Sequence, residues 1–212
     1  MMPKIFSLKE GEKALKAAVK ALEEGLVVAI PTETFYGLAV DYLNEKALKR
    51  LFSLKRRPEG KPVLLLLGDK EQVEEVVFKI SPLARKLMDH FWPGPLTLVL
   101  PARSHLSPLL TAHTGKVAVR LSSHEFPSRL ARTLGRPITG TSANLSGMPP
   151  ARSVDEILAQ LPEVDLIIDG GTLPASLPST IVDVGPEGPR LLREGKIPWS
   201  EILRITEEDP SR

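Results

Sequence analysis

The chain has 212 residues, 42% of them hydrophobic, which is enough for one sizeable core. Charged residues make up 25% and the net charge is +2, so global disorder is disfavoured and total charge is only a weak hint of nucleic-acid binding. The absence of cysteine excludes disulfides, cysteine-bound zinc, iron–sulfur clusters and a thiol nucleophile. No apolar stretch approaches the ~18 residues that span a membrane, and no signal-peptide core is present, so we expect a cytoplasmic protein.

Helical spacing of apolar residues alternates along the chain with short, continuous apolar runs. The spacing predicts helices at residues 8–24, 44–55, 70–79, 82–92, 124–135 and 153–161, with Asn44 and Ser81 as N-caps. The runs predict strands at residues 26–30, 38–43, 63–67, 96–100, 116–121, 137–140, 164–169 and 179–184. Residues 185–189 read as a turn, after which residues 189–195 pair back as a hairpin strand.

This alternation predicts a single α/β domain with a twisted, mixed parallel and antiparallel sheet and flanking helices. We expect the domain to cover residues 8–205 and residues 206–212 to form a frayed tail. The region 170–178, rich in proline and glycine, is predicted to be a surface loop over a site.

The segment SLKRRPEGKPVLLLL, residues 53–67, places a cluster of cations before an apolar run. The chain has no GxxxxGK[ST] motif and no GxGxxG after a strand, so any nucleotide phosphates would be held by cationic side chains. Arginine offers a planar fork of donors and lysine a point charge, which makes Lys55 and Arg57 candidates. The alternative is a solvated turn. Arg56, between Lys55 and Arg57, would point away from them on an extended loop, so we expect it to face solvent.

A second candidate is TGTSANLSG, residues 139–147, which follows a predicted strand. Ser142 and Asn144 lie two residues apart and would face the same way on an extended backbone. Small residues there allow close approach of a ligand; the alternative is an Asx-rich turn before the next helix. A GxSxG motif is absent, so a serine hydrolase is poorly supported.

Arg120 ends the predicted strand 116–121, where a buried guanidinium needs an anionic partner or solvent. A carboxylate is the natural partner for its fork of donors. The histidines form no HExxH pair and lie near no carboxylate cluster, so we expect structural or surface roles for them and predict no metal ligands.

Taken together in chain order, PTETFYGLAVD, SLKRRPEGKP, WPGPLTLVL, VAVR, TSANLSG, DGG, PSTIVDV and LLREG resemble the YrdC/Sua5 family of L-threonylcarbamoyladenylate synthases. The resemblance runs from about residue 12 to residue 200. It implies the short, single-domain form of the family, with an α/β twisted sheet and a basic concave surface.

The resemblance also implies a reaction. L-Threonine and bicarbonate give N-carboxythreonine, whose carboxylate attacks the α-phosphate of ATP and releases pyrophosphate, with Mg²⁺ accompanying ATP. A separate threonylcarbamoyl transferase then uses the adenylate to make t6A at position 37 of tRNA.

Motif by motif, the resemblance assigns residues to substrates. It places ATP on Lys55, Arg57, Lys61, Ser142, Asn144 and Arg193, with Lys55, Arg57, Ser142 and Asn144 as the catalytic set. It places L-threonine on Thr32, Arg120 and Ser179. The alternative function is a non-catalytic double-stranded RNA-, tRNA- or ribosome-binding factor of the same fold, whose cations would contact a phosphate backbone.

Overall fold

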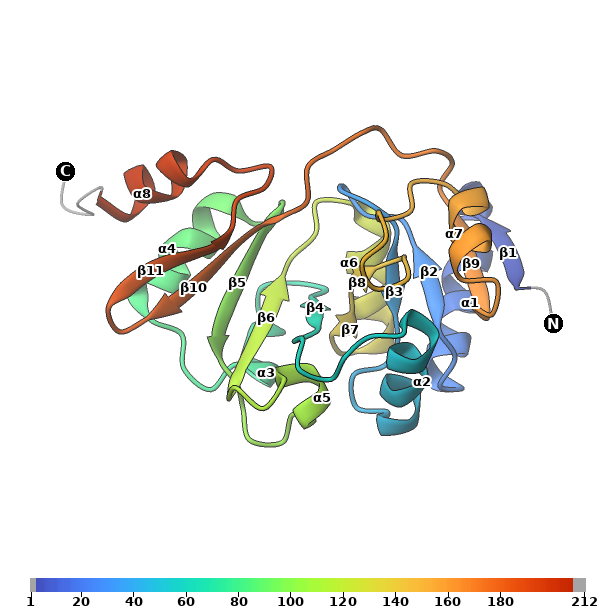
Figure 1. The fold of residues 1–212 in the computed structure, drawn as a ribbon, viewed down its shortest axis with the longest axis horizontal. Helices are drawn as coiled ribbons and strands as arrows, with labels where there is room; N and C mark the ends of the chain where they lie inside the picture. The colour runs from blue at the N-terminus through green and yellow to red at the C-terminus, as the bar shows by residue number, and fades with distance from the viewer. Residues whose placement is uncertain (1–2, 208–212) are drawn as a thin grey trace.

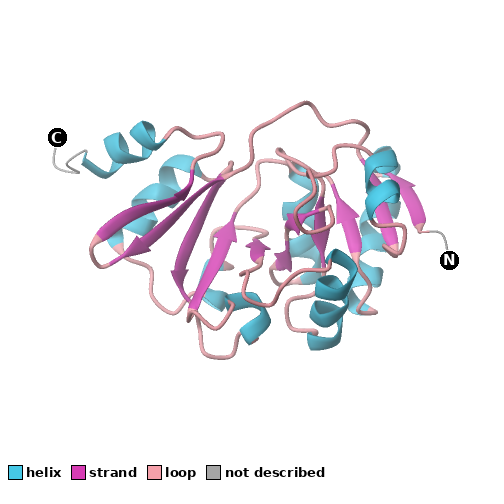
Figure 2. Ribbon diagram, in the orientation of Figure 1, coloured by secondary structure: helices cyan, strands magenta, loops and turns pink. Residues whose placement is uncertain are grey.

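The computed structural model describes residues 3–207 and confirms the mixed α/β architecture (Figures 1 and 2). Its strands divide into two sheets. The first sheet has the order β1 (Lys4–Ser7), β9 (Leu166–Asp169), β2 (Val28–Ile30), β3 (Gly37–Ala39) and β8 (Thr141–Ser142). Within it, β1, β9 and β2 run parallel, and β3 is antiparallel to both β2 and β8.

The second sheet lies beside the first in Figure 1. Its order is β11 (Gly188–Arg193), β10 (Thr180–Gly185), β5 (Leu96–Pro101), β6 (Lys116–Arg120), β4 (Leu64–Leu66) and β7 (Ile138–Thr139). The predicted hairpin is confirmed, because β11 is antiparallel to β10. Pairs β10–β5 and β4–β6 are parallel, whereas β5–β6 and β4–β7 are antiparallel.

Helices flank both sheets. Helix α1 (Glu12–Glu23) and helix α6 (Glu125–Leu134) share one apolar cluster with the first sheet, in which Leu22 and Leu130 are fully buried. The others are η1 (Leu8–Glu10), α2 (Glu45–Lys55), α3 (Val73–Val76), α4 (Pro82–Phe91), α5 (Pro108–Thr111), α7 (Val154–Gln160) and α8 (Trp199–Glu207). Over residues 3–207, none of these helices is long and apolar enough to cross a membrane.

Two predicted helices are shorter than their apolar spacing indicated. The helix expected at residues 8–24 is interrupted at Gly11, whose φ of 54° ends η1 before α1 begins. The helix expected at residues 70–79 is confined to four residues, because the chain becomes extended at Val77, which forms a β-bridge with Ala102. At Val77, pairing with the distant residue Ala102 determines the backbone conformation more than the helical spacing of apolar residues does.

Helix α8 was not predicted, and it extends two residues into the expected frayed tail 206–212. Ile202 and Ile205 are buried in the main core cluster, and α8 contacts α4. This apolar face accounts for a helix that continues to Glu207. The rest of the expected tail, residues 208–212, lies outside the described residues.

The two sheets are joined where the chain passes from β7 to β8. The strand predicted at residues 137–140 contains β7, which belongs to the second sheet, whereas β8 follows in the first sheet, with Gly140 between them. The Gly140 amide donates to the carbonyl of Leu64 at 2.8 Å. A Cβ at Gly140 would lie 2.4 Å from Cγ of the buried Leu66, so the crossing requires glycine.

Candidate functional site

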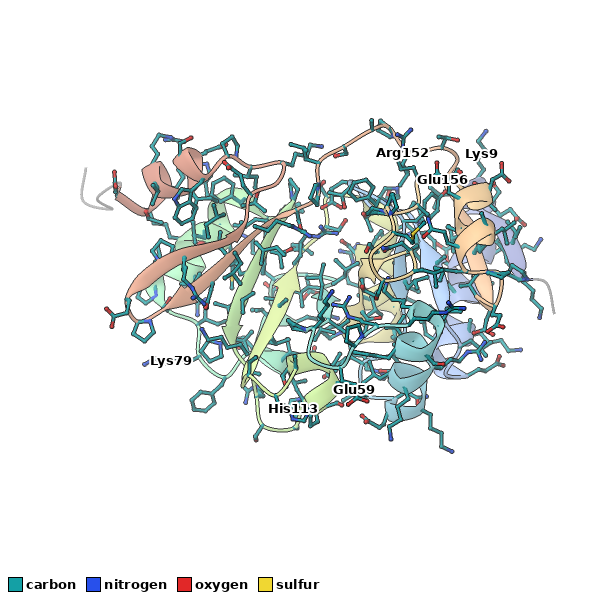
Figure 3. The ribbon with its side chains drawn as sticks, viewed as in Figure 1. Lys9, Glu59, Lys79, His113, Arg152 and Glu156 are labelled. Carbon is teal, nitrogen blue, oxygen red and sulfur yellow. The ribbon has the colours of Figure 1, made fainter. Side chains whose placement is uncertain are left out.

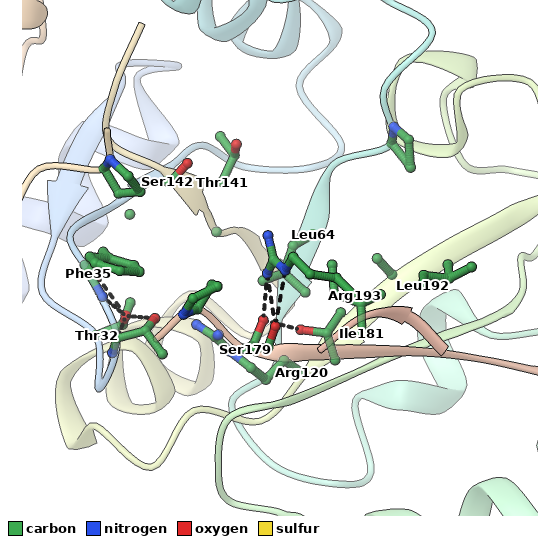
Figure 4. Close-up of a pocket in the computed structure, with 18 of the residues that line it drawn as sticks. Thr32, Phe35, Leu64, Arg120, Thr141, Ser142, Ser179, Ile181, Leu192 and Arg193 are labelled. Atoms are coloured by element: carbon green, nitrogen blue, oxygen red, sulfur yellow. Dashed lines mark hydrogen bonds between the residues drawn. The ribbon is translucent and has the colours of Figure 1, made fainter. Parts of the chain in front are cut away.

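A cavity of about 300 Å³ opens where the two sheets separate (Figure 4). Residues from both sheets line it. They include Thr32, Arg57, Leu64, Thr97, Val99, Ala118, Arg120, Ser142, Pro178, Ser179, Ile181 and Arg193. Six residues that the sequence assigned to substrates are therefore brought to one cavity: Thr32, Arg57, Arg120, Ser142, Ser179 and Arg193.

Strand register in the second sheet lays an apolar floor beneath the cavity. Ala118 on β6 pairs with Leu64 on one side and with Val99 on the other. Thr97 pairs with Ile181 across β5 and β10. Because side chains two residues apart on a strand share a face, Thr97 and Val99 point to the same side. Such a floor suits a ligand whose polar groups are read from the walls.

The loop from β9 to β10 passes from the first sheet to the second at the top of Figure 1. Residues 170–179 have no regular secondary structure, and several of them are exposed. Pro178, near the end of this loop, lines the cavity. The prediction of a surface loop beside the site therefore agrees with its placement.

Arg57 enters the cavity from the loop after α2. Its Nη2 donates to the carbonyl of Pro62 at 2.7 Å, and its guanidinium carbon lies 6.0 Å from the ring centre of Phe52. Burial lowers the pKa of Arg57. These contacts hold a desolvated cation at the cavity, as an anionic ligand requires.

Lys55 lies beneath the cavity wall rather than in it. Its side chain is 1% exposed and donates from Nζ to the carbonyl of Ser142 and, at 2.8 Å, to that of Asn144. Asn144 Oδ1 is a third acceptor at 3.3 Å. Burial, followed by the charge of Arg57, lowers the pKa of Lys55 to about 7. Three acceptors favour the protonated form, which has three donors.

The same contacts shape the loop that carries Ser142. The Ser142 hydroxyl donates to Asn144 Oδ1 at 2.6 Å, and Asn144 Nδ2 donates to the carbonyls of Leu145 and Met148. The Ser146 amide donates to the carbonyl of Lys55 at 2.9 Å. Lys55 and Asn144 thus fix the loop from inside, and Ser142 is the member of the S-x-N pair that lines the cavity.

Thr32 builds the turn at the other side of the cavity. Its hydroxyl donates to the carbonyl of Phe35 at 2.6 Å and accepts from the amides of Thr34 and Phe35 (Figure 4). The donor of this hydroxyl is therefore already used. Thr32 orders the PTETF turn and presents the remainder of its side chain to the cavity.

Ser179 and Arg193 form one unit on the wall made by β10 and β11. Arg193 Nη2 donates to the carbonyl of Ser179 at 3.0 Å and to its hydroxyl at 3.2 Å, and the hydroxyl also contacts Thr97 Oγ1 at 2.9 Å. A bulge interrupts the β10–β11 register between Ile181 and Val182. Bulges re-aim side chains beside functional sites, and this one lies opposite Arg193.

Arg120, at the end of β6, faces a carboxylate that the sequence reading did not single out. Its Nε lies 3.6 Å from Oε1 of Glu33, in the turn between Thr32 and Thr34. Burial lowers the pKa of Arg120, and Glu33 opposes that shift. The sequence did contain a signal for this contact, because an arginine at the end of an apolar strand requires an anionic partner or solvent.

Three other predicted features lie away from the cavity. Lys61 and Arg56 are exposed, and neither lines the cavity; Lys61 offers its carbonyl to Arg57 at 3.4 Å. Arg56 is exposed, and it is the C-cap of α2 in the left-handed conformation, with φ of 49°. No histidine of residues 3–207 lines the cavity either, and Figure 3 shows His113 at the outer edge of the molecule.

Comparison with known proteins identifies the family. The model of the Sua5/YciO/YrdC family, described as telomere recombination, matches residues 20–195. A threonylcarbamoyl-AMP synthase of Pyrococcus abyssi is 38% identical over 93% of this chain and 58% of its own length. A threonylcarbamoyl-AMP synthase of Vibrio vulnificus is 40% identical over 85% of this chain and 98% of its own length. The chain thus spans little more than half of the first relative and nearly all of the second.

Solved structures agree with this match. P. abyssi Sua5 complexed with L-threonine aligns with a TM-score of 0.91 and 36% identity, over 98% of this chain and 62% of that one. Escherichia coli YciO aligns with a TM-score of 0.81 and 27% identity, over 92% of this chain and 96% of that one. The chain belongs to the Sua5/YciO/YrdC family.

Proposed function

We propose that the protein is a threonylcarbamoyl-AMP synthase, which makes L-threonylcarbamoyladenylate from L-threonine, bicarbonate and ATP and releases pyrophosphate. One observation carries the proposal: a single cavity brings Arg57 and Ser142 together with Arg120 and Ser179. The first pair suits a nucleotide and the second an amino acid. Relatives with 38% and 40% identity bear the synthase name, and one solved relative was complexed with L-threonine.

ATP would bind in the cavity through contacts with Arg57, Ser142 and Arg193. Nucleotidyl transfer depends mainly on positioning and on neutralising phosphate charge, and arginine forks suit phosphate oxygens. Lys55 and Asn144 would support this site by fixing the Ser142 loop, through the hydrogen bonds described above. Lys61, exposed on the same loop as Arg57, would assist only as a mobile point charge.

L-Threonine would place its carboxylate on Arg120 and lie near Thr32 and Ser179. Its amine would attack the carbon of bicarbonate, with loss of water, to give the carbamate. The carbamate oxygen would then attack the α-phosphorus of ATP as the bond to pyrophosphate breaks. No covalent enzyme nucleophile is needed at either step.

Mg²⁺ would arrive bound to the phosphates of ATP, because it prefers phosphate oxygens and water to cages built entirely by protein. Over residues 3–207, no group of three His, Asp or Glu side chains gathers to hold a metal ion. Magnesium would therefore enter the site as part of the nucleotide substrate.

Downstream, the adenylate is a mixed anhydride that transfers its threonylcarbamoyl group readily, so a separate transferase would consume it to form t6A37 in tRNA. Direct contact with tRNA or double-stranded RNA is not required for the synthase step. A non-catalytic RNA- or ribosome-binding factor remains the alternative against which the activity is tested.

Incubation with labelled bicarbonate, L-threonine and Mg-ATP tests the function. We expect a labelled adenylate and an equal amount of pyrophosphate, both dependent on threonine. If no adenylate forms across a range of magnesium concentrations and pH values, while labelled tRNA binds, the RNA-binding alternative replaces the enzyme assignment.

Arg120→Ala is expected to raise the KM of L-threonine at least about tenfold and to leave that of ATP within about twofold, because a charged hydrogen-bonded pair is lost from one substrate only. Steady-state kinetics with each substrate varied in turn measure both constants. A larger effect on ATP than on threonine would contradict the role given to Arg120.

A further inference from the structure

Two buried polar atoms beside the cavity lack a hydrogen-bond partner in the described part of the chain. They are Oε1 of Glu33 and Nε of Arg120, 3.6 Å apart. Among residues 3–207, Arg120 lines the cavity and Glu33 does not, so the carboxylate meets the Nε edge from outside the cavity lining. Unsatisfied buried groups are uncommon in native proteins and call for an explanation.

Glu33 is held firmly on its other side. Its Oε2 accepts a hydrogen bond from the Ser122 hydroxyl, which also accepts from the His124 amide at 3.2 Å. On either side along the chain, Thr32 and Thr34 are buried and bonded to each other at 3.0 Å between their hydroxyls. The carboxylate therefore has a fixed place from which to act on Arg120.

The charges around the cavity indicate what the Glu33 carboxylate does. Arginines 57, 120 and 193 line the cavity, and no Asp or Glu of residues 3–207 is part of its lining. Burial lowers the pKa of Arg193, and repulsion from Arg120 lowers it further. The nearby His124 is partly buried, which lowers its pKa, while Glu33 and Glu125 oppose that shift. Glu33 is thus the anion placed to offset the charge of Arg120 from outside the cavity lining.

We propose that Glu33 is a positioning residue for Arg120, holding the Nε edge of the guanidinium from outside the cavity lining so that its remaining donors face the substrate carboxylate in the cavity. This proposal rests on the proposed function, in which Arg120 binds that carboxylate. A side chain as long as arginine loses much rotamer freedom when it is fixed in one geometry. Because Glu33 fixes the Arg120 side chain before the substrate arrives, less rotamer freedom is lost on binding, and the substrate binds more tightly.

Calorimetric binding of L-threonine and of L-threoninol, which has a hydroxymethyl group in place of the carboxylate, provides the test. Glu33→Gln keeps the size of the side chain and removes its charge. We expect its Kd for L-threonine to rise at least about tenfold, while its Kd for L-threoninol stays within about twofold of the wild-type value. A general structural defect would weaken both ligands, so equal losses would overturn the proposal, as would unchanged threonine binding.

Ser122→Ala is a second variant that leaves the carboxylate in place and removes its anchor at Oε2. We expect a smaller loss, again confined to L-threonine, and unchanged thermal unfolding. In the double variant Glu33→Gln/Arg120→Ala, threonine binding should be no weaker than in Arg120→Ala alone, because residues that act through one contact are not additive. Additive losses would overturn the proposal.

These measurements separate this inference from the proposed function. Wild-type protein that bound neither L-threonine nor ATP would overturn the synthase assignment and the role of Glu33 with it. If wild-type protein forms the adenylate and Arg120→Ala weakens threonine, but Glu33→Gln binds threonine normally, only the inference about Glu33 fails.

Discussion

Replacing Arg57 with alanine is expected to reduce the rate of pyrophosphate release at least about 100-fold, a loss typical of removing one preorganised donor from a developing charge. Arg57 lines the cavity, where its guanidinium is bonded to a backbone carbonyl and pairs with no carboxylate in the part of the chain that the structure describes. Pyrophosphate release with saturating threonine and bicarbonate measures the effect.

Arg56→Ala is the matched control, because it removes the same charge from the adjacent position of the same loop. Arg56 is exposed and caps α2, so its loss should leave turnover within about twofold of wild type. Equal losses in the two variants would indicate that the loop works through its summed charge. Near-normal turnover of Arg57→Ala would remove Arg57 from the ATP site.

Lys55→Met is expected to reduce turnover by a similar factor through a different cause. It leaves the buried carbonyl of Asn144 without its donor, at a cost of about 1–3 kcal/mol, whereas the Ser142 carbonyl and Asn144 Oδ1 keep the Asn144 amide and the Ser142 hydroxyl as donors. We therefore expect the midpoint of thermal unfolding to fall by about 5 °C, given the usual scaling for chains of this size. Hydrogen exchange of the amides at residues 142–148 should quicken.

Lys46→Met is the control for Lys55, since Lys46 is an exposed lysine on the same helix. It should change neither stability nor exchange. If Lys55→Met retained normal exchange at residues 142–148 and lost only affinity for ATP, Lys55 would be a direct phosphate ligand instead of a support for the loop.

Local signals predicted much of the fold. Asn44 and Ser81 cap α2 and α4 as expected, each accepting a hydrogen bond from a backbone amide three residues on. Strand β1 was missed because only its pairing with β9, far along the chain, makes residues 4–7 a strand. The division into two sheets could not be predicted from local sequence either, since nothing in PITGTS, residues 137–142, reveals that Ile138–Thr139 and Thr141–Ser142 join different sheets.

The sequence named six residues that the fold brings to one cavity, but not how they are arranged there, and their roles in binding stay predictions. Lys55 was read with the cationic loop, yet it follows Leu48, Leu51 and Phe52 by seven, four and three positions on α2, which places it on the buried face of that helix. Helical spacing therefore contained the signal that the charge cluster obscured. Glu33 was overlooked because a single carboxylate in a turn gains its meaning only from Arg120, on a strand far along the chain.

The chain passes from β7 to β8 through Gly140, so the number of residues between the two strands matters to the site as much as their identity. Side chains alternate along an extended chain, so inserting or deleting one residue between Ile138 and Ser142 would turn Ser142 to the opposite face. It would also detach the Asn144 loop from Lys55. We therefore expect homologous chains to vary freely in loop length elsewhere, but to keep this spacing wherever the cavity is functional.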